Sequence, residues 1–451
     1  MSRSMARQRI AIIGAGISGM SAAWLLDQHH EVTVFERAGR VGGHSNTVHA
    51  QTPTGITPVD TGFIVFNEEA YPNLVALFKH LNVPTAVSDM SFAVSLNNGA
   101  LEYSGSDLRG LFAQKRNIVS PRFWSMLRDL VSFYRGATRD AASLDPSTSL
   151  GDYLRAGGFG AAFRDDHLLP MAGAIWSAPA DSLLEYPAAS FIRFYENHGL
   201  LKLRDRPAWC TVVGGSEVYV ERLTRPYADR IRTGDGVAGI RRDGGTVAVR
   251  TIGGHTSQFD HVVMATHADE AVALLDDPTP QERALLGAFR YTRNLAVLHS
   301  DVTLMPKRRA AWSSWNYMGL ADGGGRDKLC VSYWMNRLQP LRCEAPVFLT
   351  LNPPRPPRAG TLLHTETYEH PLFDGAAMAS QRALWSFQGK RNTWFCGAYF
   401  GAGFHEDGLQ AGLAVAEQLG AVRRPWTVAN ESGRIALGNA SPVARASALA
   451  A

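Results

Sequence analysis

The first 36 residues contain the feature that most constrains the fold of this chain. An apolar run at residues 9–13 leads into Gly14-Ala15-Gly16-Ile17-Ser18-Gly19, and small and apolar residues follow up to Leu26. A second apolar run, EVTVF, ends just before Glu36. Short apolar runs bounded by glycine are typical of buried parallel strands. Together these segments predict a strand, a glycine-rich turn, a helix and a second strand, the arrangement of a dinucleotide-binding βαβ unit.

Each position of this motif has a physical reason. Gly14 allows the tight turn, Gly16 lets the backbone approach a pyrophosphate, and Gly19 lets the helix pack closely on the strand. The N-terminus of the helix then presents unpaired N–H groups and the positive end of its dipole to the phosphates. Glu36 lies 22 residues after Gly14, where a carboxylate accepts hydrogen bonds from a ribose and repels the 2′-phosphate of NADP.

Two further segments favour FAD over NAD. Gly42-Gly43-His44 provides a second glycine-rich loop, which a protein that binds only NAD does not need. The segment from Phe395 to Gly408 predicts a late strand, a glycine-rich turn and the start of an apolar helix. The N-terminus of that helix can stabilise the negative charge that a reduced flavin carries near N1 and O2. We therefore expect FAD as the cofactor.

The nucleotide-binding pattern returns in separated pieces, so each of two domains is expected to be discontinuous. A chain of 451 residues is too long for a single core. The predicted fold class is α/β, a Rossmann-type FAD-binding domain with an interleaved α+β substrate domain. The predicted FAD-binding domain comprises residues 1–85, 205–270 and 390–425, the substrate-binding domain comprises residues 86–204 and 271–389, and residues 426–451 form a flexible tail.

Composition and cysteine spacing argue against several functional classes. The four cysteines form no CxxC pair, so we expect neither a disulfide framework nor a bound metal. The first nine residues contain no apolar stretch typical of a secretion signal, so we expect none, and no apolar run is long enough to cross a membrane. The net charge is +4 without a sustained basic stripe, which argues against nucleic acid as a partner. The expected location is cytoplasmic, with peripheral contact at the inner membrane face as an option.

Several longer segments carry a resemblance to known flavoproteins. The chain resembles the amine oxidase, protoporphyrinogen oxidase and carotenoid desaturase superfamily. More closely, it resembles the FAD-binding oxidoreductase fused ahead of plant cyclopropane fatty acid synthases and its free-standing bacterial relatives. The resemblance covers about residues 9–420. The segments that carry it are VDTGFIVFNEEAYPNL from Val59, SDMSFAVSL from Ser88, LFAQKRNIVSPRFWSMLRD from Leu111, PMAGAIWSAP from Pro170, AAWSSWNYMG from Ala310 and WFCGAYFGAGFHEDGLQAG from Trp394.

The resemblance implies an amine oxidase-like fold and a set of FAD contacts. His44 departs from the superfamily, in which an arginine commonly follows the glycine pair. Cys396 precedes the late glycine-rich turn and does not lie where some amine oxidases attach flavin covalently, so we expect non-covalent FAD. The implied cofactor-binding residues are Gly14, Gly16, Gly19, Glu36, Arg37, Gly42, Gly43, His44, Val237, Gly397, Glu406 and Asp407.

Candidates for the chemistry are aromatic residues and one histidine. A lipid substrate would bind in an apolar, aromatic-lined tunnel, to which Trp176, Tyr333 and Tyr399 could contribute, although each is also an ordinary core residue type. His405 titrates near neutral pH in its unperturbed state and could exchange a proton beside the flavin. The alternative is that His405 only orients the turn, while the Glu406 and Asp407 pair caps the helix.

A basic stretch between Asp107 and Asp140 has two interpretations. It contains seven basic residues against three acidic ones, and four apolar residues fall on one helical face: Trp124, Leu127, Val131 and Tyr134. A basic amphipathic helix can lie on an anionic bilayer. An ordinary surface helix that buries its apolar face in the core has the same pattern.

The leading hypothesis is an FAD-dependent oxidoreductase that dehydrogenates or otherwise oxidises a fatty-acyl chain of a membrane lipid by hydride transfer to flavin N5. Its lipid substrate rests mainly on the resemblance. The alternatives are a flavin-dependent double-bond isomerase, an amine oxidase, and a flavin-bearing accessory partner of a lipid methyltransferase. The amine oxidase alternative is weakened because the flavin-facing lysine of those enzymes cannot be located in this sequence.

Overall fold

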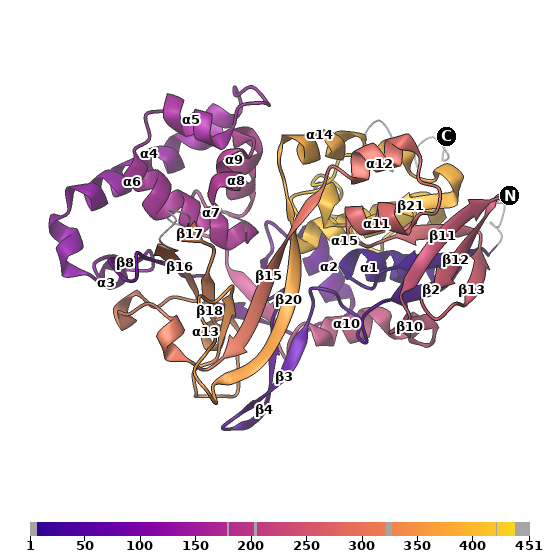
Figure 1. Cartoon of the computed structure of the whole chain (residues 1–451), viewed down its shortest axis with the longest axis horizontal. Coiled ribbons are helices and arrows are strands. Elements are labelled where there is room, and N and C mark those ends of the chain that lie inside the picture. Colours follow the sequence, from indigo (N-terminus) through magenta and orange to yellow (C-terminus); the bar gives the residue numbers. More distant parts are fainter. Residues whose placement is uncertain (1–6, 178–179, 203–204, 322–326, 421, 438–451) are drawn as a thin grey trace.

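The computed structural model describes residues 7–177, 180–202, 205–321, 327–420 and 422–437. Two sheets, one of five strands and one of eight, are the main features (Figure 1). The long strands β15 (Arg290–His299) and β20 (Leu362–Leu372) pass between the five-stranded sheet and the helices α3 to α9 (Figure 1). Of the helices that the described ranges contain, none combines the length and apolar character needed to cross a bilayer.

The five-stranded sheet is parallel and has the strand order β10-β2-β1-β14-β21. Its strands come from widely separated parts of the sequence, and the central strands β1 and β14 are almost wholly buried and apolar, as is typical of parallel sheets covered on both faces. They are β1 (Arg9–Ile13), β2 (Glu31–Glu36), β10 (Ile231–Thr233), β14 (His261–Met264) and β21 (Thr393–Phe395). The predicted strand, glycine turn, helix and strand at the N-terminus are confirmed, and so is the α/β fold class with a Rossmann-type parallel sheet.

The two helices that follow the glycine-rich turns pack against each other. Every residue of α1 (Ile17–Leu26) is buried, and α15 (His405–Gly420) lies against it. Gly412 makes the contact possible, because a Cβ there would collide with the carbonyl oxygen of Ser18. Such close approach requires glycine. The turns that precede both helices therefore lie next to each other.

The eight-stranded sheet is mixed and carries the second hydrophobic core. Its path is β20-β15-β19-β18-β16-β7-β8, with β17 paired to β16. Strands β16 and β7 are parallel and the other pairs are antiparallel. Its remaining strands are β7 (Phe92–Leu96), β8 (Leu101–Ser104), β16 (Trp315–Ala321), β17 (Asp327–Lys328), β18 (Val331–Trp334) and β19 (Phe348–Leu351).

Smaller sheets and the other helices complete the fold. The smaller strands are β3 (Thr47–Thr52), β4 (Gly55–Asp60), β5 (Phe66–Asn67), β6 (Thr85–Ser88), β9 (Trp209–Val212), β11 (Val237–Asp243), β12 (Thr246–Thr251) and β13 (Thr256–Phe259). The helices are α2 (Pro72–His80), α3 (Leu108–Leu111), α4 (Pro121–Ala141), α5 (Leu150–Ala156), α6 (Ala161–Phe163), α7 (Leu169–Trp176), α8 (Ala180–Leu184), α9 (Ala188–Asn197), α10 (Glu217–Thr224), α11 (Ala268–Leu274), α12 (Pro280–Leu286), α13 (Met335–Leu338) and α14 (Gly375–Leu384).

Within the segment 426–451 that was predicted as a flexible tail, residues 426–437 contact the rest of the fold. The indole of Trp426 stacks on Trp24, and the buried Arg434 guanidinium forms an ion pair with Asp407 at 2.6 Å. These contacts tie the C-terminal segment to α1 and α15. Residues 438–451 lie outside the described residues. The other predicted domain boundaries stay predictions.

Candidate functional site

A cavity of about 1110 Å³ runs from the five-stranded sheet to the eight-stranded sheet. We call its first part the nucleotide end, lined by Gly14, Gly16, Glu36, Val237 and Ala265. We call its second part the apolar arm, lined by Met90, Phe92, Ala174, Trp315, Tyr333, Leu349 and Leu351. The members of the arm on β7, β16, β18 and β19 are neighbours in the strand register.

The nucleotide end contains an uncapped helix N-terminus. Gly16 is the N-cap of α1, no side chain caps the helix there, and its first turn contains no acidic residue. The first N–H groups of a helix have no intrahelical partner, so an anion satisfies both them and the helix dipole. A Cβ at Gly16 would meet nothing within 4 Å, so the space in front of this turn is open.

The other two glycines of the motif have structural roles. Gly14 has a φ of +103°, and a Cβ there would lie 2.7 Å from the carbonyl oxygen of Ala265. A Cβ at Gly19 would collide with the carbonyl oxygen of Gly14. Gly19 does not line the cavity. Its role is the close packing of helix on strand that the sequence predicted.

Glu36 is held in place at the end of β2. Its Oε2 accepts the N–H of Ala15 at 2.8 Å and its Oε1 accepts the N–H of Ala38 at 2.8 Å. Each carboxylate oxygen can accept a further hydrogen bond. The carboxylate faces the cavity close to the glycine turn, in a position suited to ribose hydroxyls.

The second glycine loop packs directly on the first. A Cβ at Gly43 would lie 3.0 Å from the Cα of Gly16, and both Gly42 and Gly43 have positive φ. Arg40 donates from Nη1 to the carbonyl oxygen of Gly43 at 2.9 Å and lines the cavity. His44 occupies the position where an arginine is common in the superfamily, and Arg40, which no sequence motif marked, brings a cation to the same loop.

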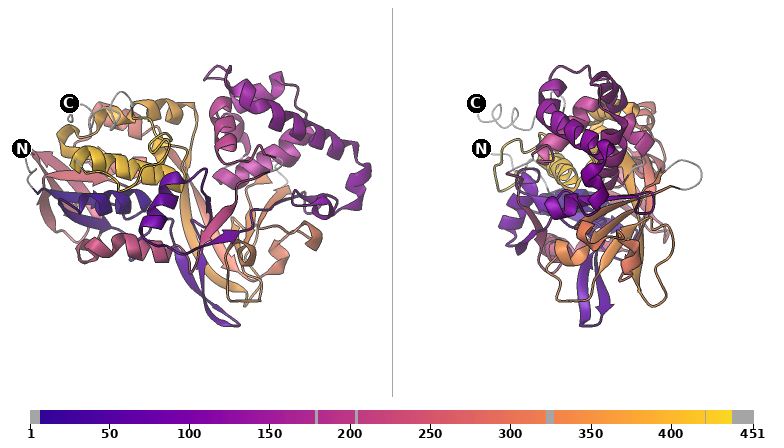
Figure 2. Two further views of the ribbon diagram at one scale, coloured as in Figure 1. Left: turned by 180° about the vertical axis from the view of Figure 1, so that it is seen from behind. Right: turned by 90° about the vertical axis from the view of Figure 1, so that its left-hand side faces the viewer.

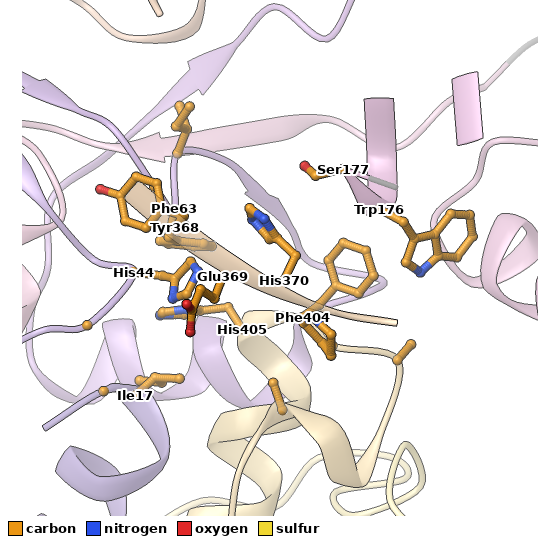
Figure 3. Close-up of a pocket in the computed structure, with 18 of the residues that line it drawn as sticks. Ile17, His44, Phe63, Trp176, Ser177, Tyr368, Glu369, His370, Phe404 and His405 are labelled. Carbon is orange, nitrogen blue, oxygen red and sulfur yellow. The ribbon is translucent and has the colours of Figure 1, made fainter. Parts of the chain in front are cut away.

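His44, His370 and His405 gather on one wall of the cavity, with Tyr368 and Glu369 beside them (Figure 3). The rings of His44 and His370 are 5.4 Å apart. Burial lowers the pKa of His44 well below its ordinary value, and the neighbouring His370 lowers it further. Burial also lowers the pKa of His370 to about 4. These histidines are therefore neutral at pH 7.

His405 lies in surroundings that do not suit the proton-exchanging role expected from the sequence. Its ring stacks on Phe63 at 4.0 Å, and its Nε2 lies 2.7 Å from the hydroxyl of Tyr219. Burial lowers its pKa to about 3, so the expected titration near neutral pH is wrong. The geometry favours the alternative that His405 orients the turn before α15.

The sequence predicted that Glu406 and Asp407 contact the flavin, but neither side chain lines the cavity, so this prediction is corrected for both side chains. Glu406 accepts the N–H groups of Asn73 and Leu74 at 3.1 and 3.0 Å, which holds the start of α2. Asp407 accepts the N–H of Phe404 at 2.8 Å and pairs with Arg434. Asp407 thus caps α15, as the alternative interpretation predicted, and both carboxylates face buried partners instead of the cavity.

The structure distributes the remaining predicted residues along the cavity. Trp176, Tyr333 and Tyr399 all line it, and Phe404 lies between His370 and Trp176 in the view of Figure 3. Tyr333 belongs to the apolar arm, while Tyr399 lies within the turn between β21 and α15. The other predicted cofactor residues that line the cavity are Gly14, Gly16, Glu36, Arg37, Gly42, Gly43, His44, Val237 and Gly397.

The residues at the nucleotide end fit FAD. An uncapped helix end, an open space at Gly16 and the fixed carboxylate of Glu36 match a pyrophosphate and a ribose. Cys396 does not line the cavity, and burial raises the pKa of its thiol, which leaves it a protonated core residue. Within the described ranges, no group of three or more His, Cys, Asp or Glu side chains is placed to hold a metal ion.

The fold and this site define an FAD-dependent oxidoreductase. The family profile described as "Flavin containing amine oxidoreductase" matches residues 17–335, and the chain belongs to this family. A curated relative, the putative flavin-containing monoamine oxidase AofH of Mycobacterium tuberculosis (strain CDC 1551 / Oshkosh), is 26% identical over 355 residues, 76% of this chain and 70% of the relative.

Solved structures share the fold. A cofactor-binding variant of putrescine oxidase superposes with a TM-score of 0.66 at 14% identity, over 92% of this chain and 99% of that chain. A fatty acid isomerase from P. acnes that produces CLA superposes with a TM-score of 0.62 at 15% identity, over 93% of this chain and 99% of that chain. At these identities the likeness establishes the fold alone.

The neutral histidines make stability depend on pH. An unfolded histidine has a pKa of about 6.5, so as the pH falls the unfolded chain binds protons before the folded chain does. The contribution of neutral His370 to the free energy of unfolding is fully present above about pH 6.5. It is lost as the pH falls toward 4. We expect His370→Asn to reduce the loss of unfolding free energy between pH 7 and pH 4.5 by about 2 kcal/mol, measured by urea denaturation with FAD in excess. The same change at the exposed His29 should leave the loss unaltered, and an equal effect at both positions would contradict the assignment.

Proposed function

We propose that this protein oxidises a fatty-acyl chain of a lipid, bound in the apolar arm. FAD, held by the glycine turn and Glu36 at the nucleotide end, would supply the two-electron oxidant for removal of two hydrogens from adjacent acyl carbons. The observation that carries the proposal is the joining of a nucleotide end and an apolar arm in one cavity. Pockets lined by aliphatic and aromatic side chains select ligands by burial of apolar surface.

The arm suits an uncharged chain better than an amine. Its seven named lining residues include no acid that could pair with an ammonium group. Glu366 and Glu369 do line the cavity, but each has a cationic partner, at 3.9 Å in Arg40 and 3.5 Å in Arg293 respectively. No lysine occurs among the described residues of the lining, which further weakens the amine oxidase alternative.

The cationic side chain of Arg206 lies where the cavity opens to solvent. Arg206 is exposed and lines the cavity, as does the exposed Val87. The described residues provide no ion pair for Arg206. A guanidinium binds carboxylates and phosphates with charge-assisted hydrogen bonds. This position supports a substrate with an apolar chain and an anionic head, such as a fatty acid or a phospholipid.

Double-bond isomerisation is the second candidate, because the solved fatty acid isomerase has the same fold. Isomerisation needs no external electron acceptor. Dehydrogenation removes two hydrogen atoms from the acyl chain and leaves the flavin reduced. Product analysis separates the two.

The test is a single turnover without oxygen, in which the holoprotein meets one lipid equivalent per flavin and the acyl chains are then analysed by mass spectrometry. We expect a product lighter by two hydrogens, in an amount that matches the flavin reduced. An unchanged mass with a moved double bond would replace dehydrogenation with isomerisation. Oxidation of simple amines without any change in lipid would overturn the proposal.

A further inference from the structure

Exposed apolar side chains gather at the end of the molecule farthest from the five-stranded sheet. Leu108, Ile118, Val119 and Trp124 are 74%, 51%, 79% and 50% exposed. They belong to α3, to the 3-10 turn at Lys115–Val119 and to the first turn of α4. Figures 1 and 2 place α3 at one end of the long axis, with the five-stranded sheet toward the other end. We call these four residues the apolar tip.

The apolar tip is held outward by a well-bonded backbone. The indole Nε1 of Trp124 donates to the carbonyl oxygen of Ile118 at 2.8 Å. The Trp124 ring also contacts Phe112, with centroids 6.0 Å apart. Asp107 caps α3 through the N–H of Gly110, and Ser120 caps α4. The side chains are thus presented on a fixed surface, and large exposed apolar groups of this kind mark interaction sites.

The surroundings of the apolar tip are basic. Residues 108–128 contain five basic residues and no acidic residue. Arg122 pairs with Asp166 and Arg128 with Asp129. The other three basic residues, Arg109, Lys115 and Arg116, are exposed and have no ion pair among the described residues. Apolar side chains ringed by unpaired cations complement an anionic bilayer, which offers phosphates at its surface and acyl chains beneath.

This surface differs from the helical face that the sequence suggested. Of the four residues predicted on one face of the helix, Tyr134 is buried and hydrogen-bonds with His167, and Leu127 and Val131 are only partly exposed. The ordinary interpretation therefore applies to most of α4, whose buried face includes Phe123, Met126 and Phe133. Of the four residues, only Trp124, at the N-terminal end of α4, belongs to the apolar tip.

We propose that the apolar tip docks the protein on the surface of an anionic lipid bilayer. Leu108, Ile118, Val119 and Trp124 enter the interfacial layer, while Arg109, Lys115 and Arg116 contact lipid phosphates. This inference goes beyond the proposed function and does not depend on it, because docking requires neither flavin reduction nor a lipid substrate.

The test is co-sedimentation of the holoprotein with vesicles of phosphatidylcholine, either pure or containing one third phosphatidylglycerol. The wild-type protein should bind the anionic vesicles, and raising the salt concentration should weaken binding. Ile118→Ser with Val119→Ser should lower the partition coefficient at least about 10-fold, and Lys115→Glu with Arg116→Glu should abolish the preference for anionic vesicles.

The matched control is Ile56→Ser with Ile252→Ser, since both isoleucines are exposed to a similar degree but lie on other elements. The control should bind as the wild type does, and all variants should retain FAD, which shows that they fold. Absence of wild-type binding to anionic vesicles, or equal loss in the control, would overturn the proposal. Binding of the wild type to a protein partner alone would overturn it as well.

Discussion

Replacement of Gly16 by valine is expected to give a folded protein that purifies without FAD. The backbone at Gly16 has φ −76° and ψ −179°, which any residue adopts, and a Cβ there meets no protein atom within 4 Å. The added side chain therefore occupies only the open space in front of α1, where the pyrophosphate must lie close to the backbone. We expect FAD affinity to fall more than about 100-fold, or about 2.7 kcal/mol.

The control for this prediction is Gly39→Val. A Cβ at Gly39 also meets nothing within 4 Å, but Gly39 is exposed and does not line the cavity. The flavin content after gel filtration and the circular dichroism spectrum are the measurements. If Gly16→Val retains a full complement of FAD, the pyrophosphate does not lie at this turn. Gly19→Ala is less informative, since its Cβ would collide with backbone and destabilise the fold itself.

Narrowing the apolar arm should separate cofactor binding from substrate oxidation. Ala174 lies on α7 and lines the arm beside the eight-stranded sheet. Ala174→Phe fills part of the arm and leaves the nucleotide end untouched. We expect normal FAD content and normal reduction by dithionite, but at least about a 100-fold lower rate of flavin reduction by a long acyl chain.

Ala142→Phe, at the exposed C-cap of α4, is the matched control and should leave all three properties unchanged. The rates are measured by stopped-flow absorbance without oxygen. An unaltered rate with long acyl chains in Ala174→Phe would show that the substrate does not enter the arm. Loss of FAD together with activity would show instead that the two ends of the cavity are not independent.

The local parts of the fold and of the site were predictable from the sequence. The strand, glycine turn, helix and acid at residues 9–36 follow from spacing along a short segment, and the structure places Gly14, Gly16 and Glu36 as that spacing requires. The late turn before α15 is local as well. Aromatic residues predicted for a tunnel, such as Trp176 and Tyr333, do line the cavity.

The parts that failed depend on partners distant in the sequence. The sequence shows acids at 406 and 407 but cannot show that Asn73 and Arg434 bind them away from the cavity. His370 reaches the site because β20 pairs with β15 over its whole length, and no local motif marks this strand. The charge state of His405 could not be predicted either, because its low pKa comes from burial by Phe63 and Tyr219.

The central claim is that an acyl chain reduces the flavin of this protein. The most direct measurement is the absorbance of the oxidised flavin without oxygen while phospholipid vesicles of defined acyl composition are added to the holoprotein, with saturated chains and simple amines as controls. We predict loss of the oxidised bands with unsaturated or methylated acyl chains and no loss with amines. Bands that persist with every lipid, or that disappear only with amines, would contradict it.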